Sequence, residues 1–491
     1  MAKISNTSCS SNILLLKAYH DLLKKGRIKK EVEIEKILRK RPVRTLSGVA
    51  VVSVLTKPYP CPGKCIFCPE EKGMPKSYLK GEPAAERAFK LNFDPYLQVK
   101  KRIESLVNQG HPTDKIEIRV IGASFTSYPK KYKVQFFSNL FAAANQRKRT
   151  SNLEKEKEIN EKTKHRIVGT SIETRPDLIN KGEIILMRKL GITMVELGVQ
   201  TTLNKILKKC RRGHTVKETI TATKLLKDAG FKVMYQLMPN LPGSNPKEDL
   251  KSFKEVFKNQ NFKPDWIKIY PCLVCKGSDL FKEWKKGKFK PYSDKELINL
   301  LIKIKKILPF WVRLARMFRD IPSSKIEAGS KLSNIREIVQ KKMKEKCKCI
   351  RCREVKERYD KKEKVFLFKE EYKASDGKEI FLSFENKKRT KLFAFLRLRI
   401  PSSNKNHFIK SLKNSVIIRE LHTYGQQTPL GETYLSPQHK GLGKKLVKES
   451  EKITKDLKKK RIAVISGVGV RDYYRKLGFR KDKEYMVKIL H

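Results

Sequence analysis

The stretch TKPYPCPGKCIFCPE, residues 56–70, carries three cysteines in the spacing C-x3-C-x2-C: Cys61, Cys65 and Cys68. Thiolates this close in sequence can converge on one metal centre, and cysteine thiolates are the ligands of iron–sulfur clusters. A four-iron cluster held by three cysteines keeps one iron open, as a catalytic metal site requires. A structural zinc site or an accidental cluster is the alternative, but zinc needs a fourth ligand and none stands nearby in the sequence. The stretch therefore predicts an open four-iron cluster.

This cysteine pattern resembles that of the radical S-adenosylmethionine (SAM) enzymes. The resemblance implies a 4Fe-4S cluster on Cys61, Cys65 and Cys68, with the amino and carboxylate groups of SAM bound to the open iron. It also implies that the reduced cluster cleaves SAM to a 5′-deoxyadenosyl radical.

The chain is strongly basic. Its 491 residues include 112 Lys and Arg against 51 Asp and Glu, which gives a formal net charge of +61. Repulsion within a positive charge of this size destabilises a compact chain unless a polyanion neutralises it. The phosphates of a nucleic acid can do so. A lysine-rich solvated surface is the alternative. The charge favours a nucleic acid as partner.

The length of the chain and the positions of its cysteines limit the classes of protein to which it can belong. A chain of 491 residues exceeds one ordinary domain, so two or three domains are expected. No apolar run reaches the roughly 18 residues of a membrane span, so no membrane association is expected. The ten cysteines fall mostly in close clusters, which suits metal ligation in a reducing cytosol better than disulfides. We expect a cytoplasmic protein.

Residues 1–44 form a basic N-terminal segment. Residues 12–20 and 32–38 show helical spacing of Leu and Ile, and the sequence KKGRIKK lies between them. A solvated helical hairpin is the alternative, but basic helices ahead of a catalytic domain suit the phosphates of RNA. We predict that this segment binds RNA.

Residues 45–320 alternate strands with helices. Helical patterns such as DPYLQVKKRIESLVNQG separate six strand-like runs, 45–56, 115–122, 166–174, 194–201, 232–240 and 266–274. This alternation predicts an α/β fold with a parallel sheet covered by helices. Six units are enough for a partial (β/α)6 barrel, with its chemistry at the carboxyl ends of the strands. The first strand leads into the cysteine loop, so we expect the cluster at that face.

Polar residues at the strand ends are candidates for a SAM pocket. Gly122 ends the second strand and would let backbone approach a ligand closely. Glu173 ends the third strand and Gln200 the fourth, where their side chains could hold the ribose, amine or carboxylate of SAM. Ordinary turn chemistry explains each residue about equally well, so the three stay candidates.

Residues 321–362 form a linker with a second cysteine cluster. Cys347, Cys349 and Cys352 stand in the sequence KCKCIRC. Three thiolates at this spacing fit a structural zinc ion, with unligated thiols as the alternative. Either cysteine of the sequence PCLVC, Cys272 or Cys275, could supply the fourth ligand.

Residues 363–491 change to an antiparallel pattern. Four strand-like runs, 364–374, 379–386, 391–400 and 415–425, precede the sequence QHKGLG and a helix that runs to about residue 457. A strand, a helix and a last strand follow. Glycines at a helix start let backbone N–H groups point at a pyrophosphate. This order resembles the GNAT acetyltransferase fold, an α+β domain that binds acetyl-CoA.

The GNAT resemblance implies roles for two groups of residues. The loop residues Gln438, Gly441 and Gly443 would hold the pyrophosphate of acetyl-CoA. A tyrosine of the last helix often lies near the thioester in this fold, so Tyr473 and Tyr474 are both candidates for a catalytic role, with core packing as the alternative for each.

Eight stretches together closely resemble the catalytic subunit of Elongator and its archaeal single-chain relatives: CPGKCIFCPE, DPYLQ, IETRPD, ELGVQT, RRGHTVKET, RELHTYG, AVISGVG and YYRKLGF. The resemblance covers residues 45–491. It implies carboxymethylation at carbon 5 of the wobble uridine, U34, in the anticodon stem-loop of tRNA, with SAM and acetyl-CoA as cofactors. Residues 1–44 would then bind tRNA. A homodimer or Elongator-like subunits remain open as further partners.

The Elongator resemblance also implies site residues. The positions that match those holding acetyl-CoA in the family are Lys115, Glu420, Leu421, His422, Thr423, Leu442, Gly443, Lys444 and Tyr474. Lys232, which opens the fifth strand, matches a lysine needed for activity. A solvated lysine at the start of a strand is the alternative reading of both Lys115 and Lys232.

Two other functions stay open at this point. One is a protein lysine acetyltransferase of the histone type, in which the GNAT domain works alone and the iron–sulfur cluster is structural. The other is a tRNA-binding scaffold without catalysis.

Overall fold

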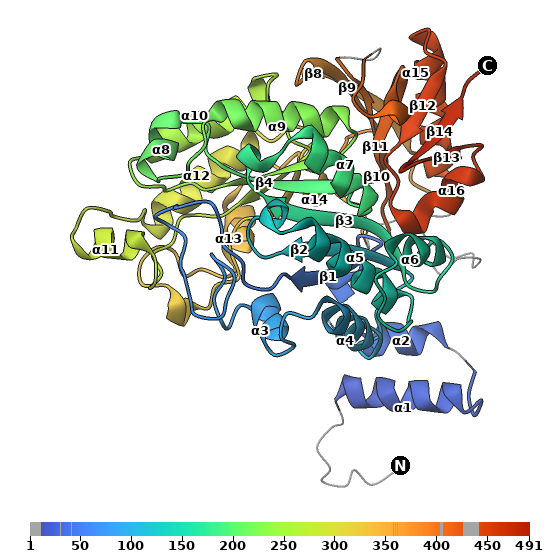
Figure 1. The fold of residues 1–491 in the computed structure, drawn as a ribbon, viewed down its shortest axis with the longest axis horizontal. Helices are drawn as coiled ribbons and strands as arrows, with labels where there is room; N and C mark the ends of the chain where they lie inside the picture. Colours follow the sequence, from blue (N-terminus) through green and yellow to red (C-terminus); the bar gives the residue numbers. More distant parts are fainter. Residues whose placement is uncertain are drawn as a thin grey trace.

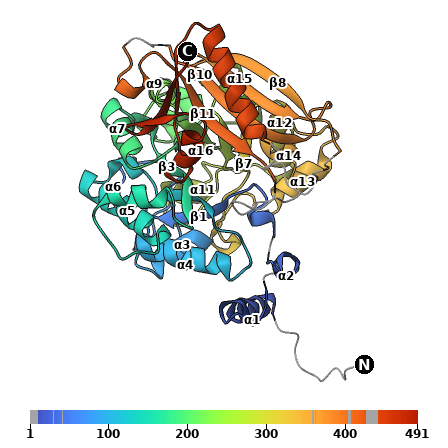
Figure 2. The ribbon, with the colours of Figure 1, turned by 90° about the vertical axis from the view of Figure 1, so that its right-hand side faces the viewer.

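The computed structural model describes residues 11–29, 31–40, 42–356, 358, 360, 362–402, 406–425 and 441–491. These residues form two seven-stranded sheets, one parallel and one mostly antiparallel, which lie side by side (Figures 1 and 2). The predicted order, an α/β half-barrel followed by an α+β domain, is confirmed.

The parallel sheet has its seven strands in sequence order. They are β1 (Ala50–Leu55), β2 (Lys115–Ile121), β3 (Arg166–Thr174), β4 (Met194–Gln200), β5 (Lys232–Leu237), β6 (Trp266–Ile269) and β7 (Arg313–Arg316). Each neighbouring pair is parallel, so all carboxyl ends lie at one edge. The six predicted strands are present. Strand β7 was not predicted, because its sequence RLAR is short and half charged.

Helices connect these strands and cover the outer face of the parallel sheet (Figure 1). None of the helices in the described part of the chain is both long and apolar enough to cross a membrane. The helices are α3 (Pro83–Phe89), α4 (Pro95–Val107), α5 (Lys130–Ala144), α6 (Leu153–Asn160), α7 (Lys181–Lys189), α8 (Asn204–Lys209), α9 (Val216–Asp228), α10 (Pro246–Lys258), α11 (Asp279–Lys285), α12 (Asp294–Lys306), α13 (Ile335–Lys342) and α14 (Ile350–Arg353).

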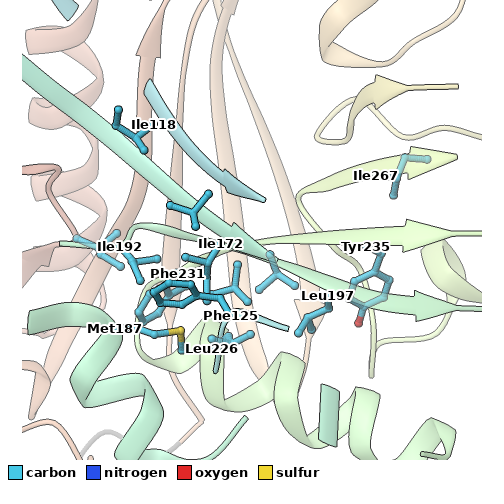
Figure 3. Packing of buried hydrophobic residues seen from close by; sticks show 14 of the residues in the cluster. Ile118, Phe125, Ile172, Met187, Ile192, Leu197, Leu226, Phe231, Tyr235 and Ile267 are labelled. Atoms are coloured by element: carbon cyan, nitrogen blue, oxygen red, sulfur yellow. The ribbon is translucent and has the colours of Figure 1, made fainter. Parts of the chain in front are cut away.

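Side chains of the parallel strands alternate between this outer face and an inner face, which we call the bore. In β2, Ile116, Ile118 and Val120 are buried in the core under the helices, part of which is shown in Figure 3. Glu117 and Arg119 alternate with them and line the cavities described below. Because successive side chains of a strand point to opposite faces, the sequence KIEIRVI sends its charges into the bore.

The second sheet has the strand order β13-β14-β12-β11-β10-β9-β8. Only β11 and β12 pair in parallel among these described strands. Helix α15 packs on the sheet through Leu446 and Val447. The elements are β8 (Phe366–Ala374), β9 (Gly377–Glu385), β10 (Leu392–Ile400), β11 (Ser415–Thr423), α15 (Leu442–Asp456), β12 (Arg461–Val464), the 3-10 helix η7 (Val468–Val470), α16 (Arg471–Arg475), β13 (Arg480–Asp482) and β14 (Tyr485–Ile489).

The two predicted N-terminal helices are present as α1 (Asn12–Lys24) and α2 (Val32–Leu38). They extend from the edge of the parallel-sheet half, next to α4 (Figure 1). The Arg39 guanidinium donates to the Gly110 carbonyl at 2.7 Å, and the His111 ring contacts the Lys40 carbonyl at 3.0 Å. These few polar contacts attach the basic segment to the loop that follows α4.

Buried charges join the two sheets. Arg419 of β11 is paired with Asp265, which precedes β6, at 2.5 Å and with Glu379 of β9 at 2.8 Å. Arg399 of β10 is paired with Asp228, the last residue of α9, at 2.6 Å. Burial raises the pKa of Asp265, but the charges of Arg419 and neighbouring cations outweigh burial and lower it. The carboxylate therefore stays ionised inside the interface.

A close backbone contact joins the same two halves. A Cβ atom on Gly467, just before η7, would lie 2.1 Å from the carbonyl oxygen of Val168 in β3. A Cβ atom on Gly469 would lie 2.6 Å from the Cβ of Arg166. Only glycine permits such an approach. The sequence SGVG thereby lets the second domain lie directly against the start of β3.

The buried ion pairs predict a large cost for a single truncation. Arg419→Met removes the cation that is hydrogen-bonded to both buried carboxylates, Asp265 and Glu379, and we expect it to lower the free energy of unfolding by about 3–5 kcal/mol. Lys369→Met is the matched control, because the Lys369–Glu371 pair is partly exposed and should contribute less than about 1 kcal/mol. Urea denaturation monitored by circular dichroism measures both. Equal losses in the two variants would contradict the structural role of the buried pairs.

Candidate functional site

A cavity of about 230 Å³ opens at the carboxyl ends of the parallel strands, and we call it the strand-end cavity. The cysteine loop, the ends of β3 to β6 and the segment after β7 line it. The loop lies here because it follows β1 directly in a sheet whose strands all run the same way.

The three cysteines of the loop border this cavity or lie beside it. Cys61 and Cys68 line it, and Cys65 is buried. The hydrogen bond with Cys68 lowers the pKa of Cys65 to about 5 against the opposing effect of burial, with further help from the charges of Arg212 and Arg175. The same hydrogen bond raises the pKa of Cys68, so Cys65 is the thiol of this pair that more readily becomes a thiolate, the form that binds metal.

The three loop thiols are not gathered around a single point. Zinc holds sulfur at about 2.3 Å, so the sulfurs around one zinc lie within about 4 Å of one another. Among the described residues, only Cys347, Cys349 and Cys352 form such a group, with all sulfurs within 4.8 Å. Cys65 and Cys68 are close enough for a hydrogen bond between their side chains, but the three loop sulfurs do not all lie within 4.8 Å of one another.

Two arginines that sequence reasoning missed reach Cys65. The Nη1 atom of Arg212 lies 3.3 Å from the Cys65 sulfur, and that of Arg175 lies 4.0 Å from it. A Cβ on Gly63 would stand 2.2 Å from Arg175, and one on Gly198 would stand 2.6 Å from Arg212. The glycines of CPGKC and ELGVQT therefore make room for these guanidinium groups. The sequence signal that could have identified them is that each arginine stands in a family motif, IETRPD or RRGHTVKET.

Glu173 is the centre of a polar network in the strand-end cavity. It accepts hydrogen bonds from the Tyr78 hydroxyl at 2.6 Å and from the Gln236 amide at 3.0 Å. The Lys268 ammonium lies 3.8 Å from Glu173 and pairs closely with Glu196 deeper in the bore. The carboxylate is thus held in a fixed orientation at the cavity wall.

Gln200 and Gly122 differ in their relation to this cavity. Gln200 lines it in a left-handed conformation, φ 68°, and its buried Oε1 has no hydrogen-bond partner in the part of the chain that the structure describes. A buried acceptor of this kind calls for a ligand donor. Gly122, at φ 123°, instead accommodates Thr56, since a Cβ would lie 2.2 Å from the Thr56 hydroxyl. On that side its close approach is to Thr56, and its part in a SAM pocket stays a prediction.

A second cavity of about 590 Å³ lies between the two sheets, and we call it the interdomain cavity. The starts of β2, β3 and β5 line one side, and β11, α15, η7 and α16 line the other. Gln438 lies outside the described residues, and the Leu442 side chain is buried in the core of the second sheet, so only its backbone can serve a ligand. The cavity brings together these predicted residues: Lys115, Lys232, Glu420, Leu421, His422, Thr423, Gly441, Gly443, Lys444, Tyr473 and Tyr474.

The first turn of α15 faces this cavity. Gly441 caps the helix in a left-handed conformation, φ 68°. A Cβ on Gly443 would lie 2.8 Å from the Tyr473 hydroxyl, so that hydroxyl stands directly over the helix start. Burial raises the pKa of Tyr473 to about 12, which keeps it a hydrogen-bond donor at neutral pH. Tyr474 is more deeply buried and packs edge-on against Phe479.

Charged groups of both domains meet in the interdomain cavity. The Lys232 ammonium lies 4.0 Å from Glu420, which also accepts a hydrogen bond from Arg397 at 2.8 Å. Burial lowers the pKa of Lys115. The His422 ring contacts the Ser47 carbonyl at 2.9 Å, and burial lowers the pKa of that histidine as well.

The second cysteine cluster lies apart from both cavities. Lys305 and Gln340 each approach the Cys352 sulfur at 3.8 Å, beside α12 and α13. Cys272 and Cys275 are not near this trio: Cys272 packs with Cys65, and Cys275 lines the strand-end cavity. The suggestion that either one completes a zinc site is therefore wrong, because the strand-end loops carry both to the opposite side of the barrel.

Comparison with known proteins identifies the family. Residues 59–256 match the Radical SAM superfamily, and residues 264–345 match the Radical_SAM C-terminal domain. Members of that superfamily use SAM and a 4Fe-4S cluster. The solved structure of archaeal Methanocaldococcus infernus Elp3 lacking residues 1–46 is 45% identical, with a TM-score of 0.80 over 91% of this chain and 100% of that one.

Full-length relatives agree with that structural match. The tRNA uridine(34) acetyltransferases of Methanocaldococcus jannaschii and Dehalococcoides mccartyi are 50% and 43% identical over 92% of this chain, covering 87% and 100% of their own lengths. Human Elongator complex protein 3 is 38% identical over 92% of this chain and 86% of its own length. The chain therefore belongs to the family of tRNA uridine(34) acetyltransferases and Elongator complex protein 3.

Proposed function

We propose that this chain is a tRNA uridine(34) acetyltransferase, which uses SAM and acetyl-CoA to form 5-carboxymethyluridine at the wobble position of tRNA. The arrangement of the two cavities carries the proposal. The cysteine loop borders one end of the bore, and lysines at the starts of β2 and β5 share a cavity at the other end with the GNAT-like helix start. The names of the relatives that span most of the chain support it.

In this proposal Cys61, Cys65 and Cys68 hold the cluster. When bound, the cluster supplies the electron that cleaves SAM to a 5′-deoxyadenosyl radical. The positive charges of Arg212 and Arg175 balance the negative charge of the Cys65 thiolate. Side chains that contact a metal ligand commonly have this effect.

The proposed SAM pocket is the strand-end cavity. Glu173 and the unpaired Oε1 of Gln200 accept hydrogen bonds from the ammonium or ribose hydroxyls of SAM. Gly122 contributes indirectly, by packing β2 against Thr56. The polar residues of this cavity suit a zwitterionic ligand.

Acetyl-CoA takes the interdomain cavity. Backbone N–H groups at the start of α15, around Gly443, hold the pyrophosphate, and the helix dipole favours its negative charge. Lys115 contributes a point charge from the barrel side. The Tyr473 hydroxyl is a hydrogen-bond donor for the thioester carbonyl, and Lys232 supplies positive charge near it.

The tRNA partner is supported by the net charge of +61. Residues 1–44 form the proposed tRNA-binding segment, 45–320 the radical SAM domain, 321–362 the linker and 363–491 the GNAT domain. The target uridine leaves its loop to enter the open strand-end cavity. We expect the enzyme in the cytoplasm, and further subunits or a second copy of the chain remain predictions.

The linker cysteines are a proposed zinc site. Cys347, Cys349 and Cys352 have the close spacing that one tetrahedral ion needs. The fourth ligand does not come from Cys272 or Cys275. A structural zinc here would hold α14 against β7 and so support the seventh strand.

Nucleoside analysis tests the proposed function. Reduced, cluster-loaded protein incubated with tRNA, SAM and acetyl-CoA should yield 5-carboxymethyluridine at U34, detected by mass spectrometry. Omission of SAM or of acetyl-CoA should abolish the product. Acetylated peptide without modified tRNA would point to a protein lysine acetyltransferase instead. Tight tRNA binding without turnover of either cofactor would point to a scaffold.

Metal analysis of three variants separates the two cysteine sites. Cys65→Ala should lose iron and its visible absorbance while keeping about one zinc per chain. Cys349→Ala should lose zinc and keep iron. Cys210→Ala is the control, because Cys210 is a buried helix-end cysteine whose loss should change neither metal. If folded Cys65→Ala retains its iron, the assignment of Cys65 to the cluster is wrong. If the wild-type protein contains no zinc, the proposed zinc site is wrong.

Calorimetric titration tests the contribution of the barrel to acetyl-CoA binding. Lys115→Met should weaken binding of a non-hydrolysable acetyl-CoA analogue about tenfold, on the order of 1.4 kcal/mol, because a phosphate loses its cation. SAM binding should not change, since the strand-end cavity is at the other end of β2. Lys162→Met, on the exposed surface after α6, is the control. Unchanged affinity in Lys115→Met would mean that the second domain holds acetyl-CoA alone.

A further inference from the structure

The two cavities open at opposite ends of the same strands. Lys115, which starts β2, lines the interdomain cavity, and Ile121, which ends it, lines the strand-end cavity. A strand of this length spans about 20 Å. Reacting atoms must approach to about 3–3.5 Å. If the proposed function is right, the acetyl group and the reactive carbon of SAM must therefore meet across the bore.

One ion pair stands between the two cavities. Glu117 lines the interdomain cavity, and Arg119, two residues later on the same face of β2, lines the strand-end cavity. The Arg119 Nε donates to the Glu117 carboxylate at 2.7 Å. Both side chains retain partial exposure, 18% and 16%, so neither is locked in a packed core. These two side chains lie at the boundary between the two cavities, which we call the partition.

A glycine and an aromatic ring flank this pair. Gly169 of β3 is in register with Glu117, and a Cβ there would lie 3.7 Å from the Thr193 hydroxyl and 3.8 Å from the Glu117 Cγ, at ordinary contact distance. On the far side the Arg119 guanidinium lies 6.0 Å from the centre of the Trp266 ring. Trp266 forms a small apolar cluster across the bore with Met194, Met234 and Ala315.

Charge gives Arg119 two alternative carboxylate partners. Burial raises the pKa of Glu117, but the charges of Arg119 and Lys232 hold it at about 2, so it remains an anion. Burial also raises the pKa of Glu196, and the charges of Lys268 and Arg119 outweigh that effect. Arg119 is therefore attracted by two carboxylates, Glu117 and Glu196, which lie on opposite sides of the partition. Its guanidinium can move away from Glu117 and still have Glu196 as an anionic partner.

We propose that the bore is a passage through which the acetyl end of an acyl-CoA thioester reaches the strand-end cavity, and that the Glu117–Arg119 pair is its gate. The CoA moiety stays in the interdomain cavity. The gate opens when Arg119 moves away from Glu117 toward Glu196, and it separates the thioester from the strand-end cavity when closed. This inference rests on the proposed function.

Bromoacetyl-CoA tests the passage without cluster, SAM or tRNA. The α-carbon of its acetyl group, next to the thioester carbonyl, carries a bromine, and a thiolate in reach attacks that carbon with loss of bromide. Ser53→Cys puts a thiol on β1 in register with Arg119, at the strand-end side of the gate. Peptide mapping of the full chain should find the introduced thiol alkylated, at least about tenfold faster with Arg119→Met added, because the open state is then favoured. Excess CoA should compete.

Gly169→Leu is the blocking variant and Gly169→Ala its matched control. Leucine extends beyond the Cβ position, where Thr193 and Glu117 already lie at contact distance, whereas alanine adds one carbon with ordinary contacts. Alkylation by bromoacetyl-CoA should be lost in the leucine variant and kept in the alanine variant. Bromoacetamide, which can enter from the strand-end cavity, should label both. Persistent bromoacetyl-CoA labelling in Gly169→Leu, or no labelling in any background, overturns the passage.

The full reaction gives a second readout. Gly169→Leu should keep SAM cleavage but lower carboxymethyluridine formation about 100-fold even at saturating acetyl-CoA, because the acetyl group cannot reach its reaction geometry. Unchanged product in a variant that folds and binds both cofactors overturns the gate. Wild-type protein that makes no carboxymethyluridine overturns the proposed function instead, and the alkylation result then stands separately.

Discussion

The buried pairing of Arg419 with Asp265 and Glu379 is the interaction on which the arrangement of the two domains depends. Loss of Arg419 would leave these buried carboxylates with fewer cations in a low-dielectric interface, where Lys227, 3.8 Å from Asp265 and 3.6 Å from Glu379, is the other cation they share. A second buried ion pair, Arg399 with Asp228, also joins the two domains. The second sheet is thereby fixed against the starts of the barrel strands, and the interdomain cavity exists only because that position is fixed.

Strand direction then decides where chemistry can occur. Parallel strands bring all carboxyl ends to one face, where the cysteine loop follows β1, and all amino ends to the face that the second domain covers. The strict alternation of β2 sends isoleucine and valine to the helices and Glu117 and Arg119 into the bore. The bore of this barrel holds these charged side chains beside the apolar cluster of Trp266, Met194, Met234 and Ala315.

Glycines serve this molecule by admitting atoms that any side chain would exclude. Gly63 and Gly198 admit the arginines that approach Cys65, Gly467 admits the backbone of β3, and Gly122 admits Thr56. Each of these glycines lies in or beside a sequence motif that could be interpreted as part of a ligand-binding site. The contacts show that several motif residues act through protein neighbours, by orienting the groups that in turn face the cavities.

The residues expected around acetyl-CoA followed from the resemblance to the Elongator family, and the cluster ligand set stays a prediction. Local pattern by itself predicted six of the seven parallel strands and the order of the second domain. These depend on spacing along the chain, which a sequence states directly. Tertiary structure alone decided that Arg175 and Arg212 meet Cys65, that Cys272 and Cys275 lie away from the Cys347 trio, and that Leu442 turns into the core. Those outcomes depend on which distant segments become neighbours. Strand pairing and buried charge settle that question only when the whole chain has folded.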